Sequence, residues 1–211
     1  MPSSPQAEAL LSTRRRVVGA GLAAAVGAAL GLHAAQPRAA TAAHAQAEEL
    51  LRKGGVVIAF RHALAPGTFD PPGFRLGDCG TQRNLSEEGR AQARKIGSWF
   101  RERQLQPASV LSSPWCRCID SAALAFRAPE VWPALGSPHG QPETTGEAHL
   151  HQLRAALAKA TLRTGQFDVW LTHMFVLSDL AMQNTVSGEG LILRAAADGK
   201  AEVLARLAVQ T

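Results

Sequence analysis

The sequence lacks the features that mark membrane-spanning, disordered and repetitive proteins. Its 211 residues contain no run of 18 or more purely hydrophobic residues, so we expect no standard membrane span. Charged residues make up only 18% of the chain and apolar residues 46%, a balance that argues against disorder. No segment repeats at a fixed period, which argues against a solenoid. The length fits one globular domain, or one domain with a tail.

Net positive charge is small outside the N-terminal segment. The formal net charge is +5, but four arginines and one glutamate give residues 1–45 a charge of +3, which leaves +2 for residues 46–211. A nearly balanced remainder is not the basic surface that binds a phosphate backbone. We therefore expect no nucleic-acid partner.

Residues 1–45 have the pattern of an export signal. Arg14-Arg15-Arg16 precede an apolar stretch rich in alanine and glycine, and small residues at 40–45 offer cleavage sites. Paired arginines before a mildly hydrophobic stretch resemble a twin-arginine signal, so we expect the twin-arginine export machinery as a partner and a periplasmic or otherwise exported protein. The mature domain is then residues 46–211. An uncleaved anchoring helix is the alternative, although such a stretch spans a membrane poorly.

Strands and helices alternate through the mature domain, which predicts an α/β layered fold. Strands rich in buried apolar residues are expected at 56–60, 109–112 and 167–171, with an edge strand at 131–135 because Pro133 cannot donate to a ladder. Helices are expected at 47–53, 86–104, 113–126 and 147–161, followed by one that ends near residue 183. Ser113 and Pro114 are the expected N-cap and first residue of the third helix. Residues 191–195 and 202–209 are expected to form a closing hairpin, or else the last segment is helical.

Polar residues follow three of the predicted strands. Arg61-His62 end the first, Ser113 and Arg117 follow the second, and Thr172-His173 end the third. The carboxyl ends of parallel strands meet at one edge of a sheet, where such sheets bind ligands. Any one of these residues taken alone is consistent with a capped helix end or a surface histidine. Together they indicate a site, which the long aperiodic loop at 63–84 would border.

This set of side chains suits phosphoryl transfer. Two guanidinium groups and a helix N-terminus can hold a phosphoryl group and stabilise its charge. A neutral imidazole can attack phosphorus once its other nitrogen is held as N–H. Water then hydrolyses the resulting phosphohistidine, so that one difficult step becomes two easier ones.

Four segments in this order resemble the histidine phosphatase superfamily: Arg61-His62, Asn84-Leu85-Ser86-Glu87-Glu88-Gly89, Ser112-Ser113-Pro114 with Arg117, and Thr172-His173. The resemblance implies a phosphoglycerate mutase-like fold, a three-layer α/β sandwich with a central, mostly parallel sheet. It also implies His62 as the nucleophile, with Arg61, Arg117 and His173 completing the catalytic pocket, and neither metal nor cofactor. The segment 79–85 is similar to small bacterial members, some of which act on phosphate groups of envelope glycolipids. The implied substrate is a small phosphorylated compound or an envelope glycolipid phosphate.

The chain departs from the family pattern in ways that leave the general acid open. Ala63 stands where members often have glycine, and Met174 stands where acid-phosphatase members have aspartate. Glu143 and Glu147 are the nearest candidates for the acid, and each is also consistent with an ordinary solvated or capping carboxylate. Without an acid, a member of this family favours good leaving groups, such as phosphohistidine or acyl phosphates.

Three cysteines allow a limited set of arrangements. A Cys79–Cys116 disulfide would pin the long loop beside Arg117, whereas Cys116 and Cys118 are too close for an unstrained bridge, and three free thiols are the other possibility. No cysteine is followed by arginine at the spacing that cysteine phosphatases need.

The remaining candidates concern substrate and metal binding. Arg75 and Arg83 either extend the anionic pocket or are solvated surface charges, and Trp115 lines the pocket mouth or packs in the core. The histidines at 139, 149 and 151 and the cysteines match no metal-site spacing, so we expect no metal.

The sequence thus predicts an exported, metal-independent phosphatase that hydrolyses a phosphomonoester or related phosphoryl compound through a phosphohistidine. A non-catalytic phosphate-binding protein and an envelope metal-binding protein are the alternatives. The oligomeric state stays open.

Overall fold

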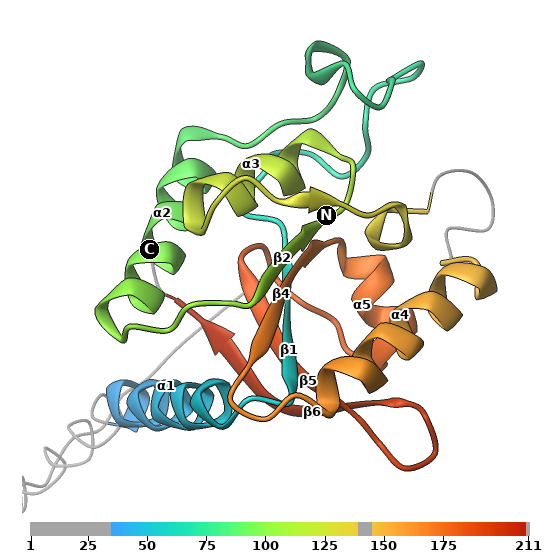
Figure 1. The fold of residues 1–211 in the computed structure, drawn as a ribbon. Helices are drawn as coiled ribbons and strands as arrows, with labels where there is room; N and C mark the ends of the chain where they lie inside the picture. The colour runs from blue at the N-terminus through green and yellow to red at the C-terminus, as the bar shows by residue number, and fades with distance from the viewer. Residues whose placement is uncertain (1–34, 139–144, 210–211) are drawn as a thin grey trace, which may run out of the picture. The chain divides into compact units, whose positions relative to one another are not determined.

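The computed structural model describes residues 35–138 and 145–209 (Figure 1). Most of the expected export signal lies outside these ranges, so the domain boundary at residue 45 stays a prediction. None of the described helices is both long and apolar enough to cross a membrane.

A six-stranded, mostly parallel sheet forms the centre of the fold. Its strand order is β3-β2-β4-β1-β5-β6. The first four strands in this order run parallel, and β5 and β6 are antiparallel additions at one edge. The bounds are β1 Val56–Arg61, β2 Ser109–Ser112, β3 Glu130–Val131, β4 Phe167–Thr172, β5 Glu189–Ala195 and β6 Ala201–Ala208.

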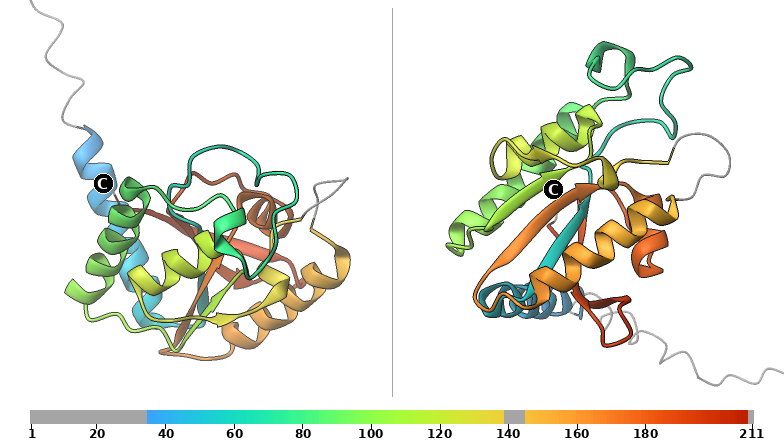
Figure 2. Two further views of the ribbon diagram at one scale, coloured as in Figure 1. Left: turned by 90° about the horizontal axis from the view of Figure 1, so that it is seen from above. Right: turned by 45° about the vertical axis from the view of Figure 1, so that its right-hand side comes forward.

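Helices cover both faces of the sheet (Figure 2). Strand β1 shows why, because its side chains alternate between two cores: Val56, Ile58 and Phe60 belong to one, and Val57 and Ala59 to the other. The first core is closed by α1 Ala35–Lys53, α2 Glu87–Glu102 and α3 Cys116–Ala125, and the second by α4 Glu147–Thr161 and α5 Met174–Ala181. The predicted three-layer α/β sandwich is confirmed.

Two helices begin at other residues than the sequence predicts. Helix α1 extends N-terminally to Ala35 instead of starting near residue 47. Helix α3 begins at Cys116 with Trp115 as its N-cap, so Ser113 and Pro114 lie before it. The Ser113 hydroxyl is engaged elsewhere, in a 2.8 Å hydrogen bond with His173.

The predicted edge strand at 131–135 and the predicted closing hairpin have different outcomes. The edge strand β3 keeps only two residues, because Pro133 starts a short 3-10 helix, Pro133–Leu135. The hairpin of β5 and β6 is confirmed and the helical alternative for the last segment is wrong. Gly199 in its turn has a φ of +79°, which glycine adopts without strain.

The loop after β1 projects beyond the carboxyl edge of the sheet, where Figure 1 shows it in teal. It contains only one short 3-10 helix, Cys79–Thr81, and its start is fixed against α2. Ser86 N–H donates to Leu64 O at 3.1 Å, and a Cβ added at Gly89 would lie 2.0 Å from the same oxygen. Glycine at 89 therefore allows α2 to approach the loop closely at Leu64, two residues after His62.

Candidate active site

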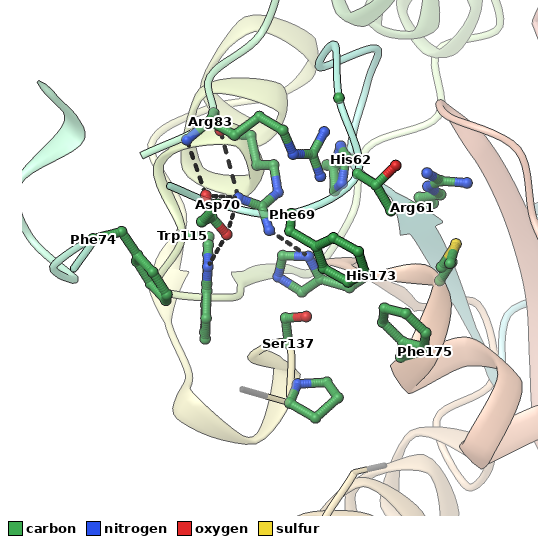
Figure 3. Close-up of a pocket in the computed structure, with 15 residues that line it drawn as sticks. Arg61, His62, Phe69, Asp70, Phe74, Arg83, Trp115, Ser137, His173 and Phe175 are labelled. Carbon is green, nitrogen blue, oxygen red and sulfur yellow. Dashed lines mark hydrogen bonds and ion pairs between the residues drawn. The ribbon is translucent and has the colours of Figure 1, made fainter. Parts of the chain in front are cut away.

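The parallel strands bring the predicted residues to one edge of the sheet. Arg61 ends β1 opposite Thr172 of β4, and His62 N–H donates to Thr172 O at 3.0 Å. Strand β2 lies on the other side of β4, and the chain leaves it towards Arg117 in the first turn of α3. These residues line a cavity of about 430 Å³ (Figure 3). Of the predicted residues it is lined by Arg61, His62, Arg83, Trp115, Arg117 and His173.

His62 is held as a neutral imidazole with one nitrogen available for attack. Its Nδ1 lies 2.8 Å from Ala63 O, and because a carbonyl only accepts hydrogen bonds, Nδ1 carries the proton and Nε2 the lone pair. Burial lowers the pKa of His62 to about 3, and the charges of Arg117, Arg83 and Arg61 contribute in the same direction. The imidazole is therefore unprotonated at neutral pH.

His173 faces His62, with ring centroids 5.5 Å apart. Arg117 NH2 lies 3.5 Å from its Nδ1 and can only donate, so Nδ1 accepts and Nε2–H donates to Ser113 Oγ at 2.8 Å. Burial lowers the pKa of His173 well below its usual value, and His62 and the neighbouring arginines add to this shift. Both histidines are therefore neutral, and the positive charge of the pocket comes from arginine.

Three arginines surround the cavity, and each is anchored through NH1. Arg61 NH1 donates to Thr185 O at 2.8 Å and Arg83 NH1 donates to Ala65 O. Arg117 NH1 donates to the carboxylate of Asp70. In each of the three, Nε is buried with no hydrogen-bond partner among the described residues. A tetrahedral oxyanion in the cavity would supply the acceptors that these groups lack.

Asp70 is the main site residue that the sequence did not reveal. Its carboxylate accepts from Arg117 NH1 at 2.9 and 3.1 Å, from Arg83 N–H at 2.9 Å and from Trp115 Nε1–H at 3.1 Å. Burial raises the pKa of Asp70, but the hydrogen bond from Arg83 N–H and the charge of Arg117 outweigh it, and the net shift is downward. With three arginines, one aspartate and two neutral histidines, the described lining carries a charge of +2.

Two further predicted residues lie away from the cavity. Arg75 pairs with Asp78 at 2.6 Å on the surface and is not part of the lining, because this neighbouring carboxylate holds it outward. Glu147 is exposed in the first turn of α4 and does not line the cavity either. Glu143 and His139 lie outside the described residues.

Apolar side chains line part of the same cavity as the arginines. The aromatic side chains of Phe69, Phe74 and Phe175 line the cavity together with Met174 and Pro138. Trp115 is buried and packs edge-on against His173, with ring centroids 5.2 Å apart. The sequence identified Trp115 but none of the phenylalanines, which follow no periodic pattern.

Cys79 and Cys116 form a disulfide between the long loop and the first turn of α3. Cys118 is a buried free thiol 3.5 Å from His173 Nε2, and burial raises its pKa to about 12. It is therefore protonated and unsuited to nucleophilic attack. In the part of the chain that the structure describes, no group of three or more His, Cys, Asp or Glu side chains is placed to hold a metal ion.

Comparisons with known proteins agree with this fold. Residues 76–138 match the model of the histidine phosphatase superfamily (branch 1), and no curated protein sequence matches the chain. The solved structure of the product of a Mycobacterium tuberculosis open reading frame is 17% identical, with a TM-score of 0.54 over 74% of this chain and 98% of that one. A putative alpha-ribazole-5'-P phosphatase from Escherichia coli is 12% identical, with a TM-score of 0.53 over 72% and 96%. A phosphoglycerate mutase from Thermus thermophilus is 17% identical, with a TM-score of 0.51 over 74% and 99%. The chain thus has a phosphoglycerate mutase-like fold, and residues 76–138 are similar to the histidine phosphatase superfamily.

Proposed function

We propose that this protein is an exported phosphatase that hydrolyses a phosphomonoester or related phosphoryl compound through a phosphohistidine on His62. The observation that carries the proposal is the neutral His62 imidazole beside three arginines whose Nε–H groups find no acceptor among residues 35–138 and 145–209. A dianionic phosphoryl group would complement the charge of +2 and provide those acceptors.

The reaction divides into two displacements at phosphorus. In the first, the Nε2 lone pair forms the P–N bond while the bond to the leaving group breaks, and the departing oxygen keeps the electron pair and takes a proton from water or an acid. In the second, water attacks phosphorus, the P–N bond breaks, its electron pair returns to Nε2, and the proton of water goes to solvent. Arg61, Arg83 and Arg117 stabilise the charge in both steps, and no metal or cofactor takes part.

The pH dependence follows from the state of His62. Its lowered pKa keeps the free enzyme's nucleophile unprotonated well below the ordinary imidazole value of about 6.5. The acid limb of kcat/KM that belongs to His62 therefore lies far below neutral pH.

The substrate we propose is a small phosphorylated compound or an envelope glycolipid phosphate. The cavity of about 430 Å³ leaves room beside the phosphoryl group, and this space is walled by Phe69, Phe74 and Phe175. A leaving group with an apolar face fits these walls.

Export is supported by two independent features. The arginine-led apolar segment resembles a twin-arginine signal, and the Cys79–Cys116 disulfide suits an oxidising compartment. We therefore propose a periplasmic or otherwise exported location.

Replacement of His62 by alanine tests the proposal directly. Wild-type protein should hydrolyse an aryl phosphate and yield acid-labile phosphate on His62, and His62→Ala should do neither. Vanadate should inhibit competitively, and Arg61→Ala should weaken its binding about tenfold or more, because one charge-assisted contact contributes about 1.5–3 kcal/mol. His151→Ala is the matched control, since His151 is exposed on α4 and lies outside the cavity lining.

The outcomes separate the alternatives. Labelling that persists in His62→Ala would contradict the nucleophile assignment. Vanadate binding that depends on Arg61, without turnover of any aryl phosphate, would favour a non-catalytic phosphate-binding protein. That alternative lacks a working general acid, and the carboxylate of Asp70, which accepts hydrogen bonds from Arg117, does not supply one.

A further inference from the structure

We propose that Asp70 is the positioning residue of the phosphate pocket: it fixes the Arg117 guanidinium so that its Nε and NH2 groups face the phosphoryl site. The inference rests on the proposed phosphatase function and adds a residue that acts through Arg117 and does not itself touch the substrate.

The contacts of Arg117 divide its guanidinium into a held part and an available part. NH1 donates to both carboxylate oxygens of Asp70, with a longer contact of 3.4 Å to Arg83 O. NH2 reaches only His173 Nδ1, at 3.5 Å, and Nε has no hydrogen-bond partner within the described residues. The Arg117 side chain is only 3% exposed, so without Asp70 its charge would be buried with no carboxylate beside it.

Asp70 also ties together segments that are distant in the sequence. Its two oxygens bridge the backbone of Arg83, the indole of Trp115 and the guanidinium of Arg117. Figure 3 shows Arg83 and Trp115 beside the Asp70 carboxylate. Because Asp70 holds the backbone of Arg83 and the guanidinium of Arg117, its removal would disturb the spacing of these two arginines.

The first turn of α3 receives further contacts from the same loop. Cys116 is bonded to Cys79 and its N–H donates to Gln82 Oε1 at 3.0 Å. Three consecutive residues, 115–117, are therefore held by loop residues, and Asp70 holds the first and the third. The long loop thus works as a scaffold for the phosphate-binding arginine.

The hydrogen bonds of Asp70 distinguish positioning from acid catalysis. All its contacts come from N–H donors, so the carboxylate serves as an acceptor on both oxygens and carries no proton to give. A positioning residue affects every substrate by the same factor, whereas an acid matters most when the leaving group is poor.

A double-mutant cycle tests this inference. Asp70→Ala, Arg117→Ala and the double variant are compared by vanadate binding and by kcat/KM on an aryl and an alkyl phosphate. We expect Asp70→Ala to weaken vanadate binding roughly tenfold or more, and the double variant to lie within about threefold of Arg117→Ala, since the two residues act as one unit. Asp70→Ala should lower kcat/KM by similar factors on both esters.

Controls keep structural loss apart from positioning. Asp78→Ala removes a carboxylate of the same loop that pairs with exposed Arg75, and should change vanadate binding less than about twofold. Circular dichroism of each variant checks that the fold persists, and Asp70→Asn, which keeps the shape but loses the charge, serves if Asp70→Ala fails to fold.

Three results would overturn the inference. Tighter vanadate binding in Asp70→Ala or Asp70→Asn would mean that Asp70 competes with the anion for Arg117. Multiplicative losses in the double variant would mean that Asp70 acts independently of Arg117. A larger loss on the alkyl ester would make Asp70 an acid. Absence of turnover in the wild type would count against the proposed function alone, because the vanadate cycle needs no turnover.

Discussion

Reduction of the Cys79–Cys116 disulfide should loosen the loop at 63–84 and impair catalysis while the sheet persists. The bridge joins residues separated by 37 positions, and the chain-entropy model gives a loss of about 4 kcal/mol of unfolding free energy for a loop of this length. The two apolar cores lie on the faces of the sheet and do not include either cysteine of the bridge. Both cores should therefore remain after reduction, and the local loosening should be confined to the loop and the first turn of α3.

The effect on activity follows from what still holds Arg117 after reduction. Its ion pair with Asp70 and the hydrogen bond between Gln82 and Cys116 N–H remain, but the covalent link one residue before Arg117 is gone. We expect kcat/KM on an aryl phosphate to fall about tenfold or more, because a small displacement of a phosphate-binding group is costly in catalysis.

The assay compares oxidised and reduced protein in three measurements. Hydrogen exchange should rise in residues 63–84 and stay low in β1 and β4, circular dichroism should retain the sheet, and kcat/KM should fall. A variant with Cys79→Ser and Cys116→Ser is the matched control and should not respond to reductant. Three titratable thiols in protein isolated from the periplasm, or collapse of the sheet on reduction, would contradict this prediction.

Two further predictions concern the general acid and export. If Glu143 protonates the leaving group, Glu143→Gln should reduce kcat/KM on an alkyl phosphate more than on an aryl phosphate. Glu147 is exposed and outside the cavity lining, so Glu147→Gln should leave both rates unchanged. Equal losses on both esters would exclude Glu143 as the acid. Replacement of Arg14 and Arg15 by lysine should block export, as fractionation with an antibody to the mature domain would reveal; export that continues unchanged would argue against the twin-arginine route.

The strands and the residues at their ends could be predicted because each is a local property of the sequence. Val56–Phe60 is apolar throughout, and the structure buries its side chains on both faces of the sheet. Once parallel strands are predicted, their shared direction places His62 and His173 at the same edge without knowledge of any contact. The positions of Arg61, His62 and His173 follow from this geometry alone. The position of Arg117 also requires that a helix follow β2.

Asp70 and the phenylalanines of the cavity could not be predicted in the same way. Asp70, Phe69 and Phe74 lie in a loop without periodicity, where a side chain's direction depends on tertiary contacts made far along the chain, and Phe175 lies in the first turn of α5. Asp70 contacts Trp115 and Arg117, which are more than 40 positions away in the sequence. Arg75 pairs with Asp78, three positions away, and the composition of the loop does not indicate that this pair forms. The N-cap of α3 was misplaced for a related reason, since Ser113 bonds to His173, 60 positions further on.

The sheet edge and the loop therefore contribute to the site in different ways. The sheet supplies reactive groups next to backbone that the strand ladder holds, since Arg61 pairs with Thr172 and His62 N–H donates to Thr172 O. The loop supplies Arg83 to the cavity and restrains α3 through Asp70, Gln82 and the disulfide. Changes in the loop should consequently alter the binding of the phosphoryl group through Arg83 and Arg117 and leave the His62 nucleophile in place. A loop variant should therefore bind anions more weakly and still form phosphohistidine, although slowly.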